Sequence, residues 1–84
     1  MESALAEMDP ETLAFKIITF LTFKDEPMRP IDIARELNEK GSSVRARLTE
    51  LKQDNLVEST GEGYISKMTS YEILMKLFRQ LSIE

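Results

Sequence analysis

The highest concentration of positive charge in this 84-residue chain lies between residues 40 and 52. Lys40, Arg45, Arg47 and Lys52 fall in that segment, against Glu50 as its single acid. Lysine and arginine neutralise phosphate groups, and an arginine can donate two hydrogen bonds to one guanine. These residue types, placed this close together, favour contact with a nucleic acid.

Small and polar side chains are interleaved with these basic residues and extend the same chemistry. Serine and threonine hydroxyls bond to base edges or to phosphate, and an alanine permits close approach and can meet a thymine methyl. The alternative is an ordinary solvated helix face, in which Arg47 pairs with Glu50 or Glu36. The predicted DNA-contacting residues are Lys40, Ser42, Ser43, Arg45, Ala46, Arg47, Thr49, Lys52 and Lys67.

The charge of the whole chain opposes this interpretation. The net charge is −4, and nonspecific affinity for nucleic acid comes from neutralising phosphates. The charge is uneven, because residues 1–39 contain four basic and nine acidic side chains and residues 40–84 contain seven basic and six acidic ones. One unbroken positive face around the basic segment favours DNA, whereas interruption by Glu36, Glu50 or Glu62 favours a protein partner.

The composition gives little support to catalysis or cofactor binding. Cysteine and histidine are absent, which excludes disulfide frameworks, thiolate zinc sites and the commonest general base. Asp32, Glu36 and Glu39 share one helix face, but such spacing is typical of the wet side of an amphipathic helix. We expect no enzyme activity and no cofactor. The apolar stretch 17–23 is too short to span a bilayer and no secretory signal is present, so a cytoplasmic protein without membrane contact is expected.

The spacing of apolar residues predicts the elements that position the basic segment. A first helix is expected to start at Asp9-Pro10, because aspartate accepts from the free N–H groups of a helix start and proline suits the first turn. A short extended piece at residues 28–30 and a second helix over 31–39 follow. Gly41 ends that helix, and a third helix capped by serine runs over residues 43–55. Two short helices joined by a tight turn match a helix-turn-helix unit.

A hairpin and a final helix follow in the sequence. Two extended runs, residues 56–60 and 64–68, flank a turn that contains glycine. Thr69 and Glu72 have the spacing of a capping box, in which each side chain satisfies backbone groups of the other. They predict a final helix over about residues 70–82.

The order of these elements and several motifs resemble microbial winged helix-turn-helix transcriptional regulators of the MarR-like, ArsR-like or GntR-like kind. The resemblance implies binding of double-stranded DNA, usually as a dimer, with the third helix in the major groove and the hairpin touching phosphates or the minor groove. This chain departs from the pattern at the wing tip, where Glu62 stands and no arginine or lysine does. The resemblance covers roughly residues 10–81, on Ile33-Ala34-Arg35-Glu36-Leu37, Ser43-Val44-Arg45-Ala46-Arg47-Leu48-Thr49-Glu50-Leu51, Leu56-Val57 and Met68-Thr69.

The terminal helices contain more apolar residues than a monomer of this size needs. Large exposed apolar patches usually mark interaction surfaces, so we predict a dimer interface there. The alternative is one wide core that absorbs all of these side chains. The predicted interface residues are Phe15, Ile18, Ile73, Leu74, Leu77, Phe78 and Leu81.

The expected fold is α+β and mostly helical: a winged helix-turn-helix with N- and C-terminal helices and a two- to three-stranded β-wing. Residues 10–84 form the domain, with the helix-turn-helix at about 31–55 and the wing at about 56–68, and residues 1–9 are a tail or a helix extension. The expected function is that of a transcriptional regulator that binds double-stranded DNA as a homodimer. The alternative is a winged-helix protein–protein interaction module of a multi-subunit complex, without direct DNA binding.

Overall fold

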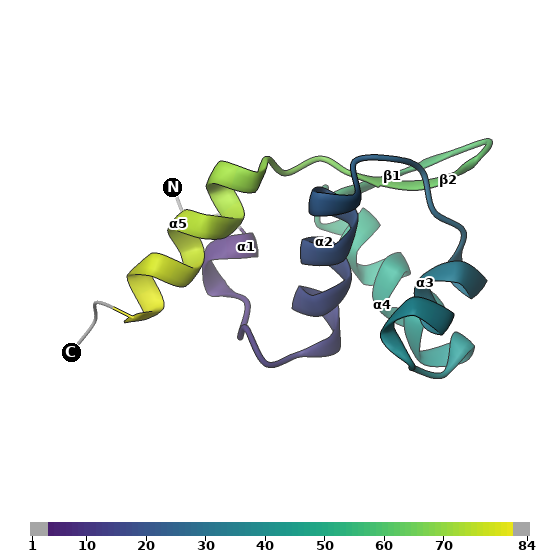
Figure 1. The fold of residues 1–84 in the computed structure, drawn as a ribbon, viewed down its shortest axis with the longest axis horizontal. Coiled ribbons are helices and arrows are strands. Elements are labelled where there is room, and N and C mark those ends of the chain that lie inside the picture. The colour runs from purple at the N-terminus through teal and green to yellow at the C-terminus, as the bar shows by residue number, and fades with distance from the viewer. Residues whose placement is uncertain (1–3, 82–84) are drawn as a thin grey trace.

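The computed structural model describes residues 4–81, which form an α+β fold that is mostly helical. Along the chain the elements are α1 (Ala4–Glu7), α2 (Leu13–Lys24), α3 (Pro30–Leu37), α4 (Gly41–Gln53), β1 (Val57–Thr60), β2 (Gly63–Ser66) and α5 (Ser70–Leu81). The molecule is elongated, 39 Å along its longest axis. α5 lies at one end of it, and α3 and the hairpin tip lie at the other (Figure 1). Within residues 4–81, no helix is long and apolar enough to cross a membrane.

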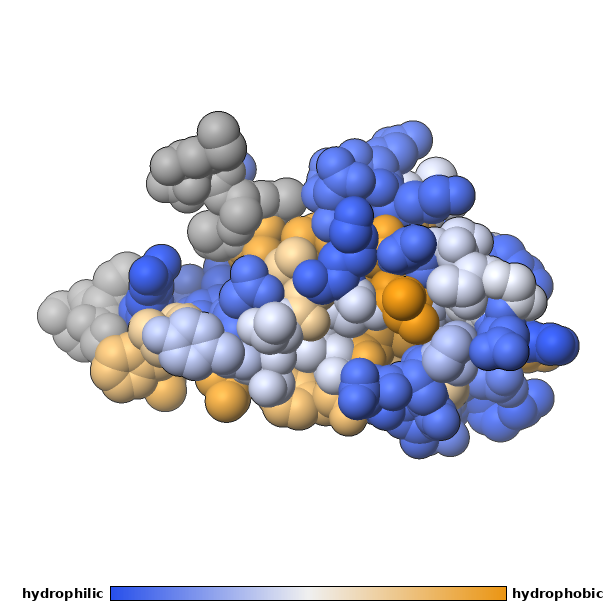
Figure 2. Space-filling model, turned by 90° about the horizontal axis from the view of Figure 1, so that it is seen from above, coloured by the Kyte–Doolittle hydropathy of each residue, from blue (hydrophilic) through white to orange (hydrophobic). Residues whose placement is uncertain are grey.

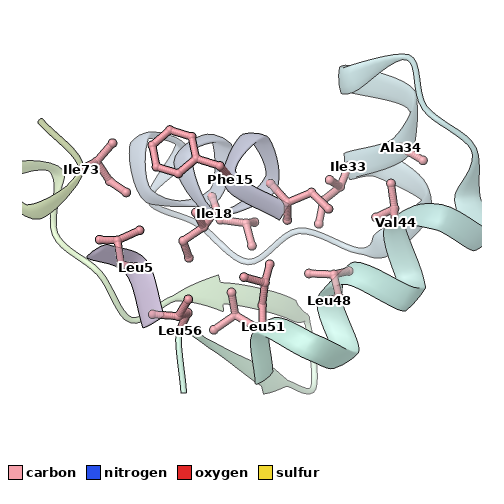
Figure 3. Packing of buried hydrophobic residues seen from close by; sticks show 13 residues of the cluster. Leu5, Phe15, Ile18, Ile33, Ala34, Val44, Leu48, Leu51, Leu56 and Ile73 are labelled. Atoms are coloured by element: carbon pink, nitrogen blue, oxygen red, sulfur yellow. The ribbon is translucent and has the colours of Figure 1, made fainter. Parts of the chain in front are cut away.

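The core lies between α2 and α4, and α1, α3, β1 and α5 close it from the sides (Figure 3). Leu5 of α1 belongs to this core, with an exposed fraction of 5%. The described part of the expected N-terminal tail therefore packs on the same core as the rest of the chain, while residues 1–3 and 82–84 lie outside the described residues. The large side chains that are almost completely buried are Ile17, Ile18, Leu21, Ile33, Val44, Leu48, Leu51 and Ile73.

Three of the residues predicted to form a dimer interface are core residues instead. Phe15 is 5% exposed, and Ile18 and Ile73 are 0% exposed, within a single chain. The prediction is wrong for these three because α2 buries two of its sides, one against α4 and the other toward α1 and α5 (Figure 3). The other predicted interface residues lie on α5: Leu77 is half-buried against the core, whereas Leu74, Phe78 and Leu81 are exposed.

The first long helix begins at Leu13, not at Asp9-Pro10. Thr12 is its N-cap, and the Thr12 hydroxyl oxygen accepts from the Phe15 N–H at 3.2 Å. Asp9 forms a turn before the helix, in which its carboxylate accepts from the Glu11 N–H at 2.9 Å. Two good capping residues stand three positions apart, and the later one is the N-cap.

The turn between α3 and α4 is made by Asn38 rather than by Gly41. Asn38 has a left-handed backbone with φ of 57°, and its N–H donates to carbonyls of the last turn of α3. Asparagine tolerates this conformation because its short polar side chain can bond locally. The chain then enters α4 at Gly41, two residues before the expected start, and α4 ends at Gln53. The predicted serine cap is therefore wrong, since Ser42 and Ser43 are inside the helix and Lys40 is the N-cap.

β1 and β2 form an antiparallel hairpin in the register Val57↔Ser66 to Thr60↔Gly63. Tyr64 also bridges Met28: the Met28 N–H donates to the Tyr64 carbonyl at 3.0 Å, and the Tyr64 N–H donates to the Met28 carbonyl at 2.8 Å. The extended piece expected at residues 28–30 thus reaches the hairpin as a single bridge. This bridge connects the hairpin to the segment that leads into α3.

The predicted capping box at the start of α5 is confirmed. The Glu72 N–H donates to the Thr69 hydroxyl at 3.1 Å, and the Thr69 N–H donates to the Glu72 carboxylate at 2.8 Å. Two otherwise unpaired N–H groups at the helix start are satisfied reciprocally. α5 then runs from Ser70 as far as Leu81.

Candidate nucleic-acid interface

The buried face of α4 determines which of its residues meet the solvent. Val44, Leu48 and Leu51 are 0–1% exposed and hold the helix against α2 and α3. At about 100° per residue, the opposite face is formed by positions 42, 45, 46 and 49, which follow the i, i+3, i+4, i+7 spacing. All four are exposed. The fold therefore brings Ser42, Arg45, Ala46 and Thr49 onto one face, as predicted.

Positive charge gathers at the N-terminal end of this face. The Arg45 side chain folds back along the first turn, where its Nη1 is 3.7 Å from the position that a Cβ on Gly41 would take. Lys40 is the N-cap and is exposed, and it provides no side-chain acceptor for the helix start. The first N–H groups of a helix have no acceptor inside the helix and carry partial positive charge. The positive charges of Lys40 and Arg45 therefore combine with the partial positive charge of the helix N-terminus at this end of α4.

Arg45 and Arg47 differ in their surroundings although two residues separate them. Arg47 Nη2 donates to the Glu50 carboxylate at 2.8 Å, and its Nε is buried without a hydrogen-bond partner among residues 4–81. Arg45, Lys40 and Lys52 form no ion pair within the described part of the chain. Arg47 therefore forms the ion pair within the helix that the alternative interpretation expects. Arg45, Lys40 and Lys52 have no such partner among residues 4–81 and could contact a phosphate.

Thr49 and Ser43 take part in the face in different ways. The Thr49 hydroxyl donates to the Arg45 carbonyl at 3.1 Å, so its oxygen can still accept but its proton is used inside the helix. Ser43 is half-buried at the edge of the face. Lys52 is exposed in the last turn of α4.

The hairpin contributes little positive charge. Its tip carries the exposed Glu62, and the exposed Glu58 lies on β1. Lys67 is exposed but follows the Val57–Ser66 pair at the base of the hairpin, away from the tip. The structure thus separates Lys67 from the tip of the hairpin.

Two of the three acidic residues expected on one helix face, Asp32 of α3 and Glu39 just after it, form surface ion pairs. Asp32 accepts from Arg35 at 3.1 Å, and Glu39 lies 3.7 Å from the Lys16 ammonium of α2. No group of three or more histidine, cysteine, aspartate or glutamate side chains is arranged to hold a metal ion within residues 4–81.

One open pocket of about 340 Å³ lies between the C-terminal end of α2 and β2. Leu21, Ile65 and Met68 provide apolar lining, and the hydroxyls of Thr22 and Ser66 lie 2.6 Å apart in a hydrogen bond. The Thr22 hydroxyl donates to the Ile18 carbonyl at 2.7 Å, so its oxygen can accept from the Ser66 hydroxyl. This second hydrogen bond joins α2 to the hairpin. Their role is structural.

Comparison with known proteins gives no further guidance, since no protein-family model, no curated protein and no solved structure matches the chain.

Proposed function

We propose that this chain is a winged-helix protein that binds double-stranded DNA by placing α4 in the major groove, and that it acts as a transcriptional regulator. The element order supports the winged-helix assignment: two helices joined by a tight turn are followed by a hairpin and a final helix. One observation carries the functional proposal. The exposed face of α4 presents Ser42, Arg45, Ala46 and Thr49 together, at the helix end where positive charge gathers.

The dimensions and chemistry of this face suit a groove. An α-helix with its side chains is about 10–12 Å across, and the major groove of B-DNA is about 12 Å wide. Arg45 is the residue to donate to a guanine edge, because its guanidinium has no carboxylate partner among the described residues. Ala46 has the small side chain that lets the helix approach closely and can contact a thymine methyl. Lys40 and Lys52 lie at the two ends of α4, where they can contact the phosphate groups that border the groove.

The number of open cations sets the expected strength of binding. Lys40, Arg45 and Lys52 can neutralise about three phosphates for each chain, which predicts a slope of log affinity against log salt of about −3. Proteins that make 6–10 such contacts show much steeper slopes. We therefore expect weak binding at physiological salt by one chain, with measurable binding at low salt.

The test is a fluorescence-anisotropy titration, first with duplexes selected from a random pool and then with the selected site. Arg45→Ala is expected to weaken binding roughly five- to 150-fold and to relax the base preference at one position. Arg79→Ala removes the same charge from α5, at the other end of the molecule, and should leave affinity within about twofold. Equal losses from Arg45→Ala and Arg79→Ala, or no duplex binding by the wild type at low salt, contradict the proposal.

A second function, that of a protein–protein interaction module, is favoured by one specific observation. The pair between Arg47 and Glu50 removes one cation from α4 and places a carboxylate beside its exposed face. Glu58 and Glu62 give the hairpin an acidic surface as well. A chain that fails to bind any duplex at low salt but remains folded would support this function over DNA binding.

A further inference from the structure

α5 carries two separate apolar faces, of which the core covers one. Ile73 is 0% exposed, and Leu77 is half-buried beside it. The other face consists of large apolar side chains that remain 55–79% exposed, which is unusual for a helix of a single small domain. The residues of this second face are Tyr71, Leu74, Phe78 and Leu81, and we call them the α5 stripe.

The α5 stripe follows the spacing of a helix–helix contact. Positions 71, 74, 78 and 81 repeat as i, i+3, i+7, i+10, which is the a/d pattern of a heptad. At 100° per residue they fall within about 80° of the helix surface, and Ile73 lies about 120° from their centre. One 12-residue helix, roughly 18 Å long, therefore presents a seam for a second helix while its other side holds the core.

The stripe lies at the end of the molecule that is farthest from α3 and the hairpin tip (Figure 1). In Figure 2, apolar side chains lie in the middle and toward the α5 end of the face shown, whereas the opposite end is mainly hydrophilic. A partner on α5 therefore leaves the exposed face of α4 accessible.

We propose that two copies of this chain associate through their α5 stripes, with the two helices antiparallel. A twofold axis through the middle of the stripe places Tyr71 opposite Leu81 of the second copy, and Leu74 opposite Phe78 of the second copy. Every layer then joins one aromatic ring and one leucine, so all layers have similar volume. A parallel arrangement instead puts tyrosine on tyrosine and leucine on leucine, and it aligns the two helix dipoles unfavourably.

The area of the stripe comes close to what a second copy of the chain requires. The exposed parts of four large side chains amount to roughly 500–600 Å² on each copy, or about 1,100 Å² for the pair. This value is close to the lower limit of about 1,200 Å² for specific protein–protein interfaces, and half-buried neighbours such as Met75 add to it. The isologous contact needs no partner of different chemistry, because the stripe is complementary to itself.

The first test is the molar mass by sedimentation equilibrium from about ten micromolar to several hundred micromolar. Wild type is expected to shift from monomer to dimer over this range, and Phe78→Glu to raise the dissociation constant roughly thirtyfold or more. Phe23→Glu is the matched control, since Phe23 is 53% exposed on α2 and Phe78 is 60% exposed on α5. Thermal melts by circular dichroism verify that each variant folds. A monomeric wild type at the highest concentration, or equal effects of the two substitutions, overturns the proposal.

The second test determines the direction of the helices. The chain contains no cysteine, so single cysteines report unambiguously. Antiparallel packing predicts that a mixture of Tyr71→Cys and Leu81→Cys chains forms a disulfide-linked heterodimer on mild oxidation, while each variant alone crosslinks poorly. Disulfides form only between Cβ atoms about 3.5–4.5 Å apart. Efficient crosslinking of Tyr71→Cys with itself overturns the antiparallel arrangement, and this outcome does not depend on whether the chain binds DNA.

Discussion

Replacement of Gly63 by alanine tests how the hairpin is held on the rest of the fold. Gly63 begins β2 with φ of +140°, a backbone conformation that residues with a side chain rarely adopt. A Cβ at this position would lie 2.6 Å from both the carbonyl carbon and the oxygen of Met28. Met28 cannot retreat easily, because it exchanges two hydrogen bonds of 2.8 and 3.0 Å with Tyr64, the residue after the glycine.

The expected destabilisation combines two costs. Holding a non-glycine residue in such a backbone conformation costs about 1–3 kcal/mol, and forcing an extra carbon into a packed contact costs about 1–3 kcal/mol more. The sum of about 2–6 kcal/mol is large for an 84-residue chain, whose total stability is of the order of 4–13 kcal/mol. At about 4–8 °C per kcal/mol for a domain of this size, Gly63→Ala should lower Tm by roughly 8–48 °C.

Thermal unfolding followed by circular dichroism at 222 nm measures this effect, with urea unfolding as the second measurement. Gly61→Ala is the matched control, since a Cβ there meets nothing within 4 Å and Gly61 is not among the glycines with positive φ. It should leave Tm unchanged within about 3 °C. A Gly63→Ala protein that melts within 3 °C of the wild type would show that the Met28–Gly63 contact is not a constraint on the fold.

Three further substitutions test other parts of the structure. Leu48→Ala should cost about 2–5 kcal/mol in urea unfolding because Leu48 is 0% exposed in the core, and a loss below 1 kcal/mol contradicts that placement. Thr69→Ala should cost about 1 kcal/mol by removing the capping box with Glu72, and an unchanged urea midpoint argues against it. Glu50→Gln should release Arg47 and strengthen duplex binding several-fold in low-salt anisotropy titrations, and weaker binding would mean that Glu50 itself contacts the DNA.

Local patterns predicted those elements whose signals lie within a few neighbouring residues. The capping box at Thr69 is predictable because it depends on a contact between residues three positions apart, and the hairpin because its turn joins Thr60 and Gly63, which are also three positions apart. The start of α2 is not predictable in this way, because Asp9 and Thr12 are both good caps three positions apart and nothing local separates them. The sequence also predicts the wrong position for the turn after α3, at Gly41 instead of Asn38, because both residue types tolerate a left-handed backbone.

Periodicity identified the apolar faces of the terminal helices but not what covers each of them. α5 has one face toward the core and one toward the solvent, and both contain large aliphatic residues. Sequence alone could not tell that Ile73 is buried while Leu74, one residue later, is 55% exposed. Tyr71 was missed as a member of the stripe, although its heptad spacing to Leu74, Phe78 and Leu81 was a signal that could have found it.

The two arginines of α4 show that helical spacing, and not charge, predicts which side chains lie on the exposed face of the helix. Arg45 and Arg47 have the same side chain, but two residues on a helix correspond to about 200° of rotation. Arg47 therefore lies on the flank near the core and reaches Glu50, three residues later, while Arg45 stays on the face opposite Val44 and Leu48. The spacing alone predicts that the two arginines separate, and Glu50 is one of the two acidic partners that the sequence offers to Arg47.

The net charge of −4 bears on the proposed DNA contact less than its value suggests. Exposed charges are screened over about 8–10 Å at physiological ionic strength, whereas the molecule is 39 Å long. Acids at the α5 end, such as Glu72, therefore contribute little to the potential at the N-terminal end of α4. The carboxylate that matters most is Glu50, which lies on α4 itself and opposes the small group of cations around Arg45. The balance within this local group, and not the total charge, determines whether the exposed face of α4 can hold a phosphate backbone.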